Sequence, residues 1–174
     1  IIAAGSIVQF TDDSYGTIQS WSWDFEGGNP SSSTQQSPLV MYYQPGQYTV
    51  SLTVSDGISS NTLTRTAYIM AATEYTMQNG TFTTCAGIFY DNGGENSNYG
   101  NNKNLVMTFF PDQSDKKLTA RFTSFSVEPD PACANDWLTI YDGPDVNAPL
   151  IGKFCGLDSP GWITATGAEG ALTF

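Results

Sequence analysis

The sequence predicts an all-β protein made of two antiparallel β-sandwich domains in tandem. Segments that alternate apolar and polar residues with period two, and that are rich in β-branched and aromatic residues, recur at short spacing. Clusters of Gly, Pro, Asn, Ser and Asp separate these segments, and no amphipathic helix of useful length is found. Apolar residues make up 40% of the chain and aromatic residues 13%, which is enough material for packed cores.

Nine segments are expected to form strands. Within the segment "SWSWDF", Trp21 and Trp23 point to one face and Ser22 to the other, so we expect one of the two tryptophans to be the central core residue between the sheets. Glycines at 27 and 28 allow a turn with positive φ. The nine expected strands cover residues 6–12, 20–25, 39–43, 47–56, 64–70, 105–110, 117–127, 137–143 and 149–156.

The composition excludes several classes of partner and activity. Six basic residues stand against 17 acidic ones, and the net charge of −11 disfavours nucleic acid and anionic lipid as partners. No apolar run is long enough to insert in a membrane. The chain has no His, which removes the usual general base and every Ser-His or Cys-His nucleophile. We therefore expect a non-enzymatic region, although a catalytic domain elsewhere in a longer protein stays open.

A shift in composition near residue 73 predicts the domain boundary. Before it Arg65 is the only basic residue and there is no Cys, whereas all three cysteines follow it. Residues 70–77 form a plausible short junction, so the expected domains are 1–73 and 74–174. Because the chain begins close to a strand and stops on the alternating "GALTF", we expect it to be part of a larger multidomain protein.

The first domain carries, in order, the motifs "VQFTDDS", "SWSWDFEGGNPSSSTQQSP", "YYQPGQYTVSLTVSDG" and "TRTAYIM". Residues 7–69 thereby resemble a PKD domain, an immunoglobulin-like β-sandwich, in the form common in secreted proteins of Bacteroidetes, which implies type IX secretion. The resemblance implies a spacer and binding module without chemistry of its own. It also implies that Asp24 ties down turn backbone, and not that it ligates a metal or acts as a catalytic acid.

The second domain carries "CAGIFYDNGGENSNYGNN", "KKLTARFTSFSVEPDPACANDWLTIYDG" and "PLIGKFCG". Residues from about 80 to 174 resemble a CUB domain whose last strands are missing from this sequence. The resemblance implies a disulfide between Cys133 and Cys155, and hence an oxidising compartment. The family's partner for Cys85 falls near Phe109 and Phe110, so Cys85 is expected to be a free, buried thiol; the alternative is that it pairs with a part of the protein outside this sequence.

The CUB resemblance also implies a calcium site. Calcium-binding members use a Tyr in an early loop, a Glu before the first disulfide Cys and an Asp three residues after it, and Tyr99, Glu128 and Asp136 occupy those positions. Ca²⁺ requires hard oxygen ligands gathered from loops. The expected ligands are the carboxylates of Glu128 and Asp136, with Tyr99 orienting a carboxylate and a third carboxylate lying beyond Phe174. Asp130 matches no ligand and is expected to be solvated.

Together these observations predict an extracellular binding or adhesion region of a larger secreted or cell-surface bacterial protein. Its CUB domain is expected to present a calcium-dependent interaction face to a protein or polysaccharide ligand. Two alternatives stay open: the two domains are accessory to a secreted hydrolase such as a metalloprotease, or they are a structural spacer in a surface stalk or filament.

Overall fold

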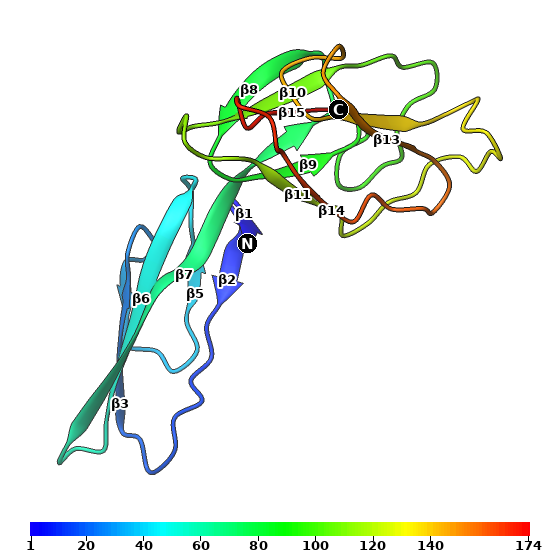
Figure 1. Cartoon of the computed structure of the whole chain (residues 1–174). Helices are drawn as coiled ribbons and strands as arrows, with labels where there is room; N and C mark the ends of the chain where they lie inside the picture. The colour runs from blue at the N-terminus through cyan, green and yellow to red at the C-terminus, as the bar shows by residue number, and fades with distance from the viewer. The chain divides into compact units, whose positions relative to one another are not determined.

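A computed structural model describes residues 1–174, which divide into two compact units (Figure 1). The first unit contains residues Ile1–Tyr75 and Ala86–Ile88, and the second contains Thr76–Cys85 and Phe89–Phe174. Strands are the only regular elements, so the predicted all-β class is confirmed. The strands are β1 (Ile2–Ala3), β2 (Ile7–Gln9), β3 (Ser20–Phe25), β4 (Ser32–Ser33), β5 (Leu39–Met41), β6 (Gly46–Ser55), β7 (Ser60–Thr76), β8 (Gly80–Thr84), β9 (Gly87–Tyr90), β10 (Met107–Pro111), β11 (Thr119–Arg121), β12 (Leu138–Tyr141), β13 (Leu150–Phe154), β14 (Trp162–Thr164) and β15 (Leu172–Thr173).

The predicted junction lies almost entirely within a strand. Strand β7 runs without a break to Thr76, so most of residues 70–77 are strand. The segment Ala86–Ile88, which includes the first two residues of β9, belongs to the first unit, and β9 pairs with β7. The first unit therefore extends two residues past the predicted boundary at 73 and also includes this later segment. No helix in the structure is long and apolar enough to cross a membrane.

The first unit closes around an aromatic cluster. Its main sheet has the order β1-β7-β6-β3-β4, and β2 pairs with β5 in a second sheet. Trp23 is 6% exposed and stacks on Phe25 with 5.6 Å between ring centroids, and Phe10 lies 4.7 Å from Phe25. Trp23 is therefore the central core residue. Trp21 packs only partly against the cluster, and its indole Nε1 donates a 2.7 Å hydrogen bond to Asp12.

The turn after β3 is held by Glu26 and not by Asp24, contrary to expectation. Asp24 is exposed and its carboxylate makes no hydrogen bond. Glu26 Oε2 accepts a 2.8 Å hydrogen bond from the backbone of Thr49, and this bond lowers the pKa of Glu26. Gly27 has a φ of 65°, and a Cβ there would lie 2.2 Å from the ring of Tyr48. Only glycine fits that position, because both the backbone angle and the neighbouring ring exclude a side chain.

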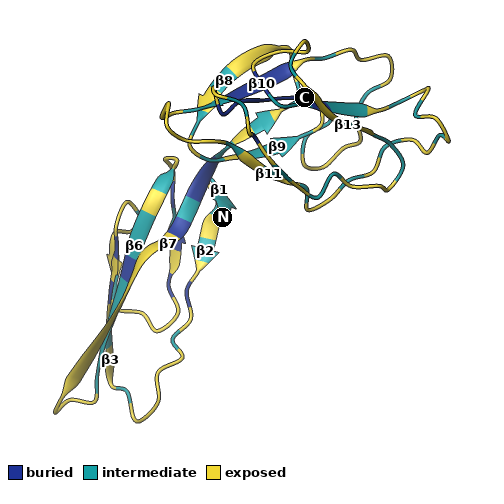
Figure 2. Ribbon diagram, in the orientation of Figure 1, coloured by how far each residue is buried: buried dark blue, intermediate teal, exposed yellow.

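The second unit buries a cluster of phenylalanines beneath a five-stranded sheet of order β13-β12-β15-β10-β8, while β11 pairs with β14. The ring of Phe174 lies 5.2 Å from Phe89, 6.1 Å from Phe109 and 6.3 Å from Phe122. The buried residues of β10 and β15 line the middle of this sheet (Figure 2). The aromatic rings thus form the apolar centre of this unit.

Two strand pairs differ from the antiparallel pattern. β1 pairs with β7 in parallel, and β8 pairs with β10 in parallel over five residues, Met107 opposite Gly80 to Pro111 opposite Thr84. Parallel neighbours need a long connection that brings the chain back in the same direction. The segment between β8 and β10, which contains the predicted loop "DNGGENSNYGNN", provides that connection.

Tyr42 is a fully buried core residue whose hydroxyl has no hydrogen-bond partner. Its ring stacks on Tyr48 at 5.1 Å. Burial, with a smaller contribution from the nearby Tyr48, raises the pKa of Tyr42 to about 12. A buried polar group without a partner costs stability, because it gives up its bond to water and gains none in return.

We predict that Tyr42→Phe raises the free energy of unfolding by about 1 kcal/mol at pH 7, because it removes the unpaired hydroxyl. Above pH about 10 the unfolded chain's Tyr42 ionises while the folded one stays neutral up to about pH 12, so the wild type loses stability over that range and the variant lacks this loss. Urea denaturation at pH 7 and between pH 10 and 12 measures both effects. The matched control is Tyr43→Phe, at an exposed neighbour. It should change neither the stability at pH 7 nor the loss of stability between pH 10 and 12. A Tyr42→Phe variant less stable than wild type would contradict the unpaired hydroxyl.

Candidate functional site

A long loop between β9 and β10 forms one side of the candidate site. It is rich in Asn and Gly and lacks any apolar periodicity, so side chains and not strand pairing hold its shape. Asp91 Oδ1 accepts a 2.7 Å hydrogen bond from the backbone of Gly93, which closes a turn at the start of the loop. Asn92 Oδ1 accepts a 3.1 Å bond from the backbone of Gly100. The second bond closes the loop directly beside Tyr99.

The loop between β11 and β12 forms the other side, and Asp130 organises it. Asp130 Oδ1 accepts a 2.9 Å hydrogen bond from the backbone of Ala132, and Oδ2 accepts a 3.2 Å bond from Asn135. These bonds, the one from Ala132 foremost, lower the pKa of Asp130. The expectation that Asp130 is simply solvated is therefore wrong, because its carboxylate replaces the backbone partners that this irregular segment lacks.

A disulfide anchors the same loop. Cys133 and Cys155 are bonded, with their Cα atoms 5.6 Å apart and a separation of 22 positions in sequence. The backbone of Val127 donates a 2.9 Å hydrogen bond to Gly156, next to the second cysteine. Closing a loop of this size stabilises the folded state by about 3 kcal/mol in the chain-entropy account. Covalent and hydrogen-bonded attachments together fix the loop to the end of β13.

Tyr99 joins the two loops. Its hydroxyl donates a 3.0 Å hydrogen bond to Asp136 Oδ2 and accepts a 2.9 Å bond from the backbone N–H of Glu128. Asp136 lies two residues before β12, whose pairing with β13 fixes its position. The structure therefore joins Tyr99 to the carboxylate of Asp136 and to the backbone of Glu128, the other two residues that the CUB resemblance implies for calcium.

The electrostatics of the group follow from this geometry. Partial burial is the main reason that the pKa of Tyr99 is raised, and the adjacent carboxylates of Asp136 and Glu128 raise it further. Tyr99 thus stays a neutral hydroxyl that donates to Asp136. Only one oxygen of Asp136 is used in this way, and the Glu128 carboxylate is exposed and makes no hydrogen bond.

These oxygens suit a hard cation such as Ca²⁺ but supply only part of its coordination. Ca²⁺ takes six to eight oxygen ligands, roughly 2.3 to 2.6 Å away. Glu128 and Asp136 offer carboxylate oxygens from two different places in one loop, and Tyr99 orients one of them. No group of three or more acidic or cysteine side chains lies together as a metal site. The two carboxylates are of the ligand type that Ca²⁺ takes, and the remaining ligands would have to come from water or from further residues.

Cys85 is free, as expected, but it is exposed and not buried. The physical reason is its place in the sheet. The last paired residue of β8 is Thr84, opposite Pro111. Cys85 follows the end of that pairing and so lies outside the sheet, whereas Phe109 fills the interior instead. The side chain therefore has no neighbouring sulfur and no cover.

Asp142 is a loop anchor. Its Oδ1 accepts hydrogen bonds from the backbone of Thr166 at 2.8 Å and of Gly167 at 3.2 Å, and its Oδ2 accepts one from the Thr166 hydroxyl. The bond from that hydroxyl is the main cause of a lowered pKa of Asp142. Both oxygens therefore serve to hold the segment that contains Thr166 and Gly167.

Sequence reasoning missed the exposed Trp137 beside this group. Trp137 is 49% exposed, directly follows Asp136, and carries the Lys153 ammonium 3.8 Å from its ring centroid. A second cation–π pair lies elsewhere in the domain. The Arg121 guanidinium carbon is 5.3 Å from the centroid of the Trp162 ring, and Trp162 is 69% exposed. The only signal in the sequence was the position of Trp137 next to a predicted ligand.

Comparison with known proteins agrees with both resemblances. The family model of the PKD domain matches residues 1–69, and that of the CUB domain matches residues 72–174. Cubilin of Rattus norvegicus is 34% identical over 98 residues, which are 52% of this chain and 3% of cubilin. Zinc metalloproteinase nas-39 of Caenorhabditis elegans is 35% identical over 74 residues, 42% of this chain and 8% of that protein. Tolloid-like protein 2 of Homo sapiens is 45% identical over 58 residues, 33% of this chain and 6% of that protein. The chain thus spans only a small part of each relative.

We predict that Tyr99→Phe lowers the free energy of unfolding by about 1 to 2 kcal/mol, because it leaves Asp136 and the Glu128 N–H without their partner. Urea denaturation at pH 7 measures the change. Tyr15→Phe removes a hydroxyl from a side chain that is 99% exposed and serves as the control, which should not change stability. Equal stabilities of the wild type and the Tyr99→Phe variant would contradict the bridging role of Tyr99.

We also predict that Asp130→Ala is destabilising at pH 7 and reduces the acid sensitivity of the protein. A carboxyl group whose pKa is lowered on folding stabilises the fold above its unfolded pKa, near 4, and loses that contribution as the pH falls through the folded value. The melting temperature should therefore fall less between pH 7 and pH 3 in the variant than in the wild type. The control is Asp158→Ala, which removes an exposed carboxylate without hydrogen bonds. Its melting temperature should fall between pH 7 and pH 3 by as much as that of the wild type.

Proposed function

Because the chain belongs to the CUB family and carries a PKD domain ahead of its CUB domain, we propose that it is a non-enzymatic binding region of a larger extracellular protein. Both families are non-catalytic modules. No His is present to act as the usual general base, and Asp130 and Asp142 are engaged in structural hydrogen bonds. We further propose that the protein is secreted or displayed on the cell surface of a bacterium. The disulfide supports this location, because disulfides form and persist in oxidising environments outside the cytoplasm.

The proposed interaction face is calcium-dependent and consists of Tyr99, Glu128 and Asp136. The observation that supports it most is the Tyr99 hydroxyl, which donates to Asp136 and accepts from the Glu128 backbone. Tyr99 thereby orients the Asp136 carboxylate and holds the backbone of Glu128, the residue that carries the other proposed ligand. Such preorganisation favours binding, since less loop ordering is needed when the ion enters.

Bound Ca²⁺ would supply positive charge that offsets the repulsion between the two carboxylates. Glu128 and Asp136 would hold the ion, and Tyr99 would keep the Asp136 carboxylate oriented. The carboxylate oxygens that stay open would then accept a basic side chain of a partner. On this proposal the partner that contacts the face is a protein or polysaccharide ligand that carries positive charge. A third carboxylate beyond Phe174 completes the coordination of the ion.

We predict that isothermal titration calorimetry with CaCl₂ on the 174-residue chain yields a single weak site with a Kd on the order of 10⁻⁴ to 10⁻³ M, the range of extracellular modules. A chain that continues past Phe174 should bind more tightly. Asp136→Asn should abolish the binding heat, since the amide keeps its volume but loses the charge, and Asp158→Asn is the matched control that should retain it. Heat that persists in Asp136→Asn, or no heat from either chain length, would rule out the site.

A second candidate function has one observation in its favour. One of the matched relatives is named a zinc metalloproteinase, and on that basis the two domains could serve as accessory modules of a secreted hydrolase. The two candidates assign the same roles to the residues of this chain. An HExxH motif upstream in the full gene would favour the hydrolase, whereas arrays of further β domains would favour the adhesion protein.

A further inference from the structure

One exposed face of the second unit carries basic, aromatic and hydroxyl side chains but no acidic ones. It belongs to the two-stranded sheet of β11 and β14 (Figure 1). Period-two alternation turns Ala120 and Ile163 inward, where they are half-buried, and leaves the residues on either side of them exposed. We call this surface the β11–β14 face. Its six residues, in cross-strand pairs, are Lys117 and Thr166, Thr119 and Thr164, and Arg121 and Trp162.

Arg121 has no acidic partner, although the chain contains 17 acidic residues. Of the six basic residues only Lys116 forms an ion pair, with Asp115 at 3.3 Å. The Arg121 guanidinium carbon lies 5.3 Å from the centroid of the Trp162 ring, and no hydrogen bond within the chain uses its N–H groups. Those donors are therefore open to a carboxylate, which a guanidinium binds through two parallel hydrogen bonds.

Trp162 holds Arg121 in place. Its ring is 69% exposed and makes no other ring contact, so the residue contributes little to the core. A cation–π contact restricts the long Arg side chain, which then loses less conformational freedom when a ligand binds. Trp and Arg are also the side chains that most often dominate the binding energy of protein interfaces. The pair is thus suited to act as an anchor for a partner.

The Lys117 ammonium lies at the other end of the face. It donates a hydrogen bond to the Thr166 carbonyl, which fixes its position. The nearby Asp142 balances part of its charge, and the pKa of Asp142 is lowered foremost by the Thr166 hydroxyl and further by the Lys117 ammonium. Between the two cations, Thr119 and Thr164 share a 3.0 Å hydrogen bond between their hydroxyls, which leaves one hydroxyl proton free to donate.

The spacing of the two cations suits an extended ligand. Lys117 and Arg121 are four positions apart, which is about 13 Å along a strand at roughly 3.3 Å per residue. In an extended peptide the side chains at positions i and i+4 lie the same distance apart on one side of the chain. In a helix they would be only about 6 Å apart. An extended segment with carboxylates four positions apart therefore matches both cations.

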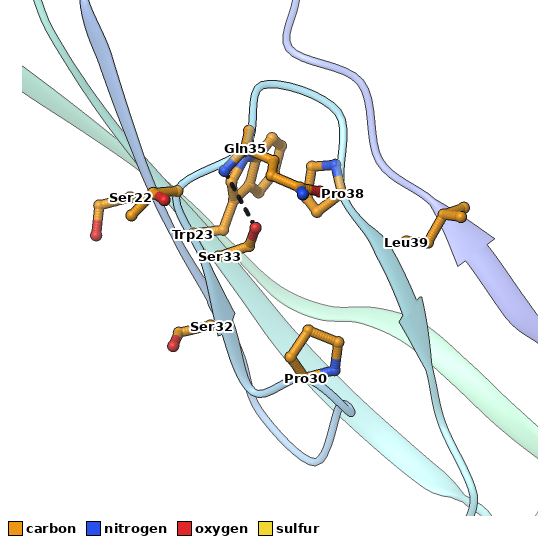
Figure 3. A pocket seen from close by; sticks show the side chains of 9 residues that line it. Ser22, Trp23, Pro30, Ser32, Ser33, Gln35, Pro38 and Leu39 are labelled. Atoms are coloured by element: carbon orange, nitrogen blue, oxygen red, sulfur yellow. Dashed lines mark hydrogen bonds between the residues drawn. The ribbon is translucent and has the colours of Figure 1, made fainter.

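Charge decides which partner fits this face. The net charge of −11 repels anions at long range, so attraction to an acidic ligand depends on cations whose donors are open at close range. The hollow of about 480 Å³ beside β4 in the first unit offers none, since every residue that lines it is uncharged (Figure 3). The β11–β14 face offers two. A protein segment is favoured over an acidic polysaccharide, because the Arg121 side chain covers a face of the Trp162 ring on which a sugar would stack.

We propose that the β11–β14 face binds an extended acidic segment of a partner protein. One carboxylate of the segment accepts hydrogen bonds from Arg121 beside Trp162, and a second carboxylate four positions away pairs with Lys117. The free hydroxyl donor between them bonds to a carbonyl of the segment. No residue of the proposed calcium face takes part, so the binding requires no ion and does not rest on that proposal.

Fluorescence anisotropy of the whole chain with a rhodamine-labelled peptide tests the proposal. The probe has twelve residues with Glu at every fourth position between Thr and Ser, and a second peptide of the same composition has its three Glu residues adjacent. We expect the spaced peptide to bind about threefold more tightly than the clustered one. Binding should persist in EDTA, which separates this face from the calcium face, and it should weaken about tenfold when the salt concentration rises from about 0.05 M to about 0.5 M.

Removal of each cation locates the binding. Arg121→Gln should weaken it about tenfold, and Lys117→Gln about threefold, since Asp142 already balances part of the Lys117 charge. Two controls remove one positive charge elsewhere and should bind like wild type. Arg65→Gln removes an arginine that lies over a tyrosine ring in the first unit, and Lys116→Gln removes the ion-paired neighbour of Lys117.

Trp162→Ala separates an anchoring role from a direct contact. It should weaken binding about threefold in the wild type and should have no effect in the Arg121→Gln background, because Trp162 acts by holding the Arg121 side chain. Circular dichroism melting confirms that each variant folds.

Three results would overturn the proposal. One is equal binding of the spaced peptide by the wild type and by Arg121→Gln. Another is tighter binding of oligogalacturonate than of the spaced peptide, which would assign the face to an acidic polysaccharide. The third is self-association in sedimentation velocity that Arg121→Gln abolishes, which would make a second copy of the chain the partner.

Discussion

The alternation of side chains along β-strands is the constraint on which both units depend. In β3 it places Trp23 and Phe25 on the face that packs with Phe10, and it leaves Ser22 on the opposite face. Burial of the aromatic face stabilises the sheet, and it also fixes the register, because a slip of one residue would exchange the two faces. The exposed β11–β14 face of the second unit is a consequence of the same constraint.

Strand alternation does not set the shape of the candidate calcium face, since its residues lie in loops without a regular backbone pattern. There the shape comes from specific side-chain bonds: Asp130 holds the turn before Cys133, the disulfide fixes that turn to the end of β13, and Tyr99 joins it to the neighbouring loop. Each attachment replaces strand pairing. Such loops can carry polar groups at high density because the sheet beneath them, with its phenylalanine cluster, supplies the stability.

The two proposed binding surfaces of the CUB domain use opposite charges. The calcium face would use carboxylates and an ion, and its binding would depend on calcium and on salt. The β11–β14 face would use Arg121 and Lys117, and its binding would depend on salt but not on calcium.

The sequence by itself determined the features that depend on local pattern or on matched motifs. These were the all-β class, nine of the strands, the two families and the cysteine pair that forms the disulfide. The grouping of Tyr99 with Asp136 followed from the CUB resemblance. Tertiary structure decided what depends on pairing between distant segments. It set the short strands such as β4 and β8, the parallel pairs, the exposure of Cys85 past the end of β8 and the structural role of Asp130. It also placed Arg121 beside Trp162, since residues of β11 and β14 become neighbours only through cross-strand register. Local periodicity says which face a side chain takes, but only the folded sheet says which residue lies beside it.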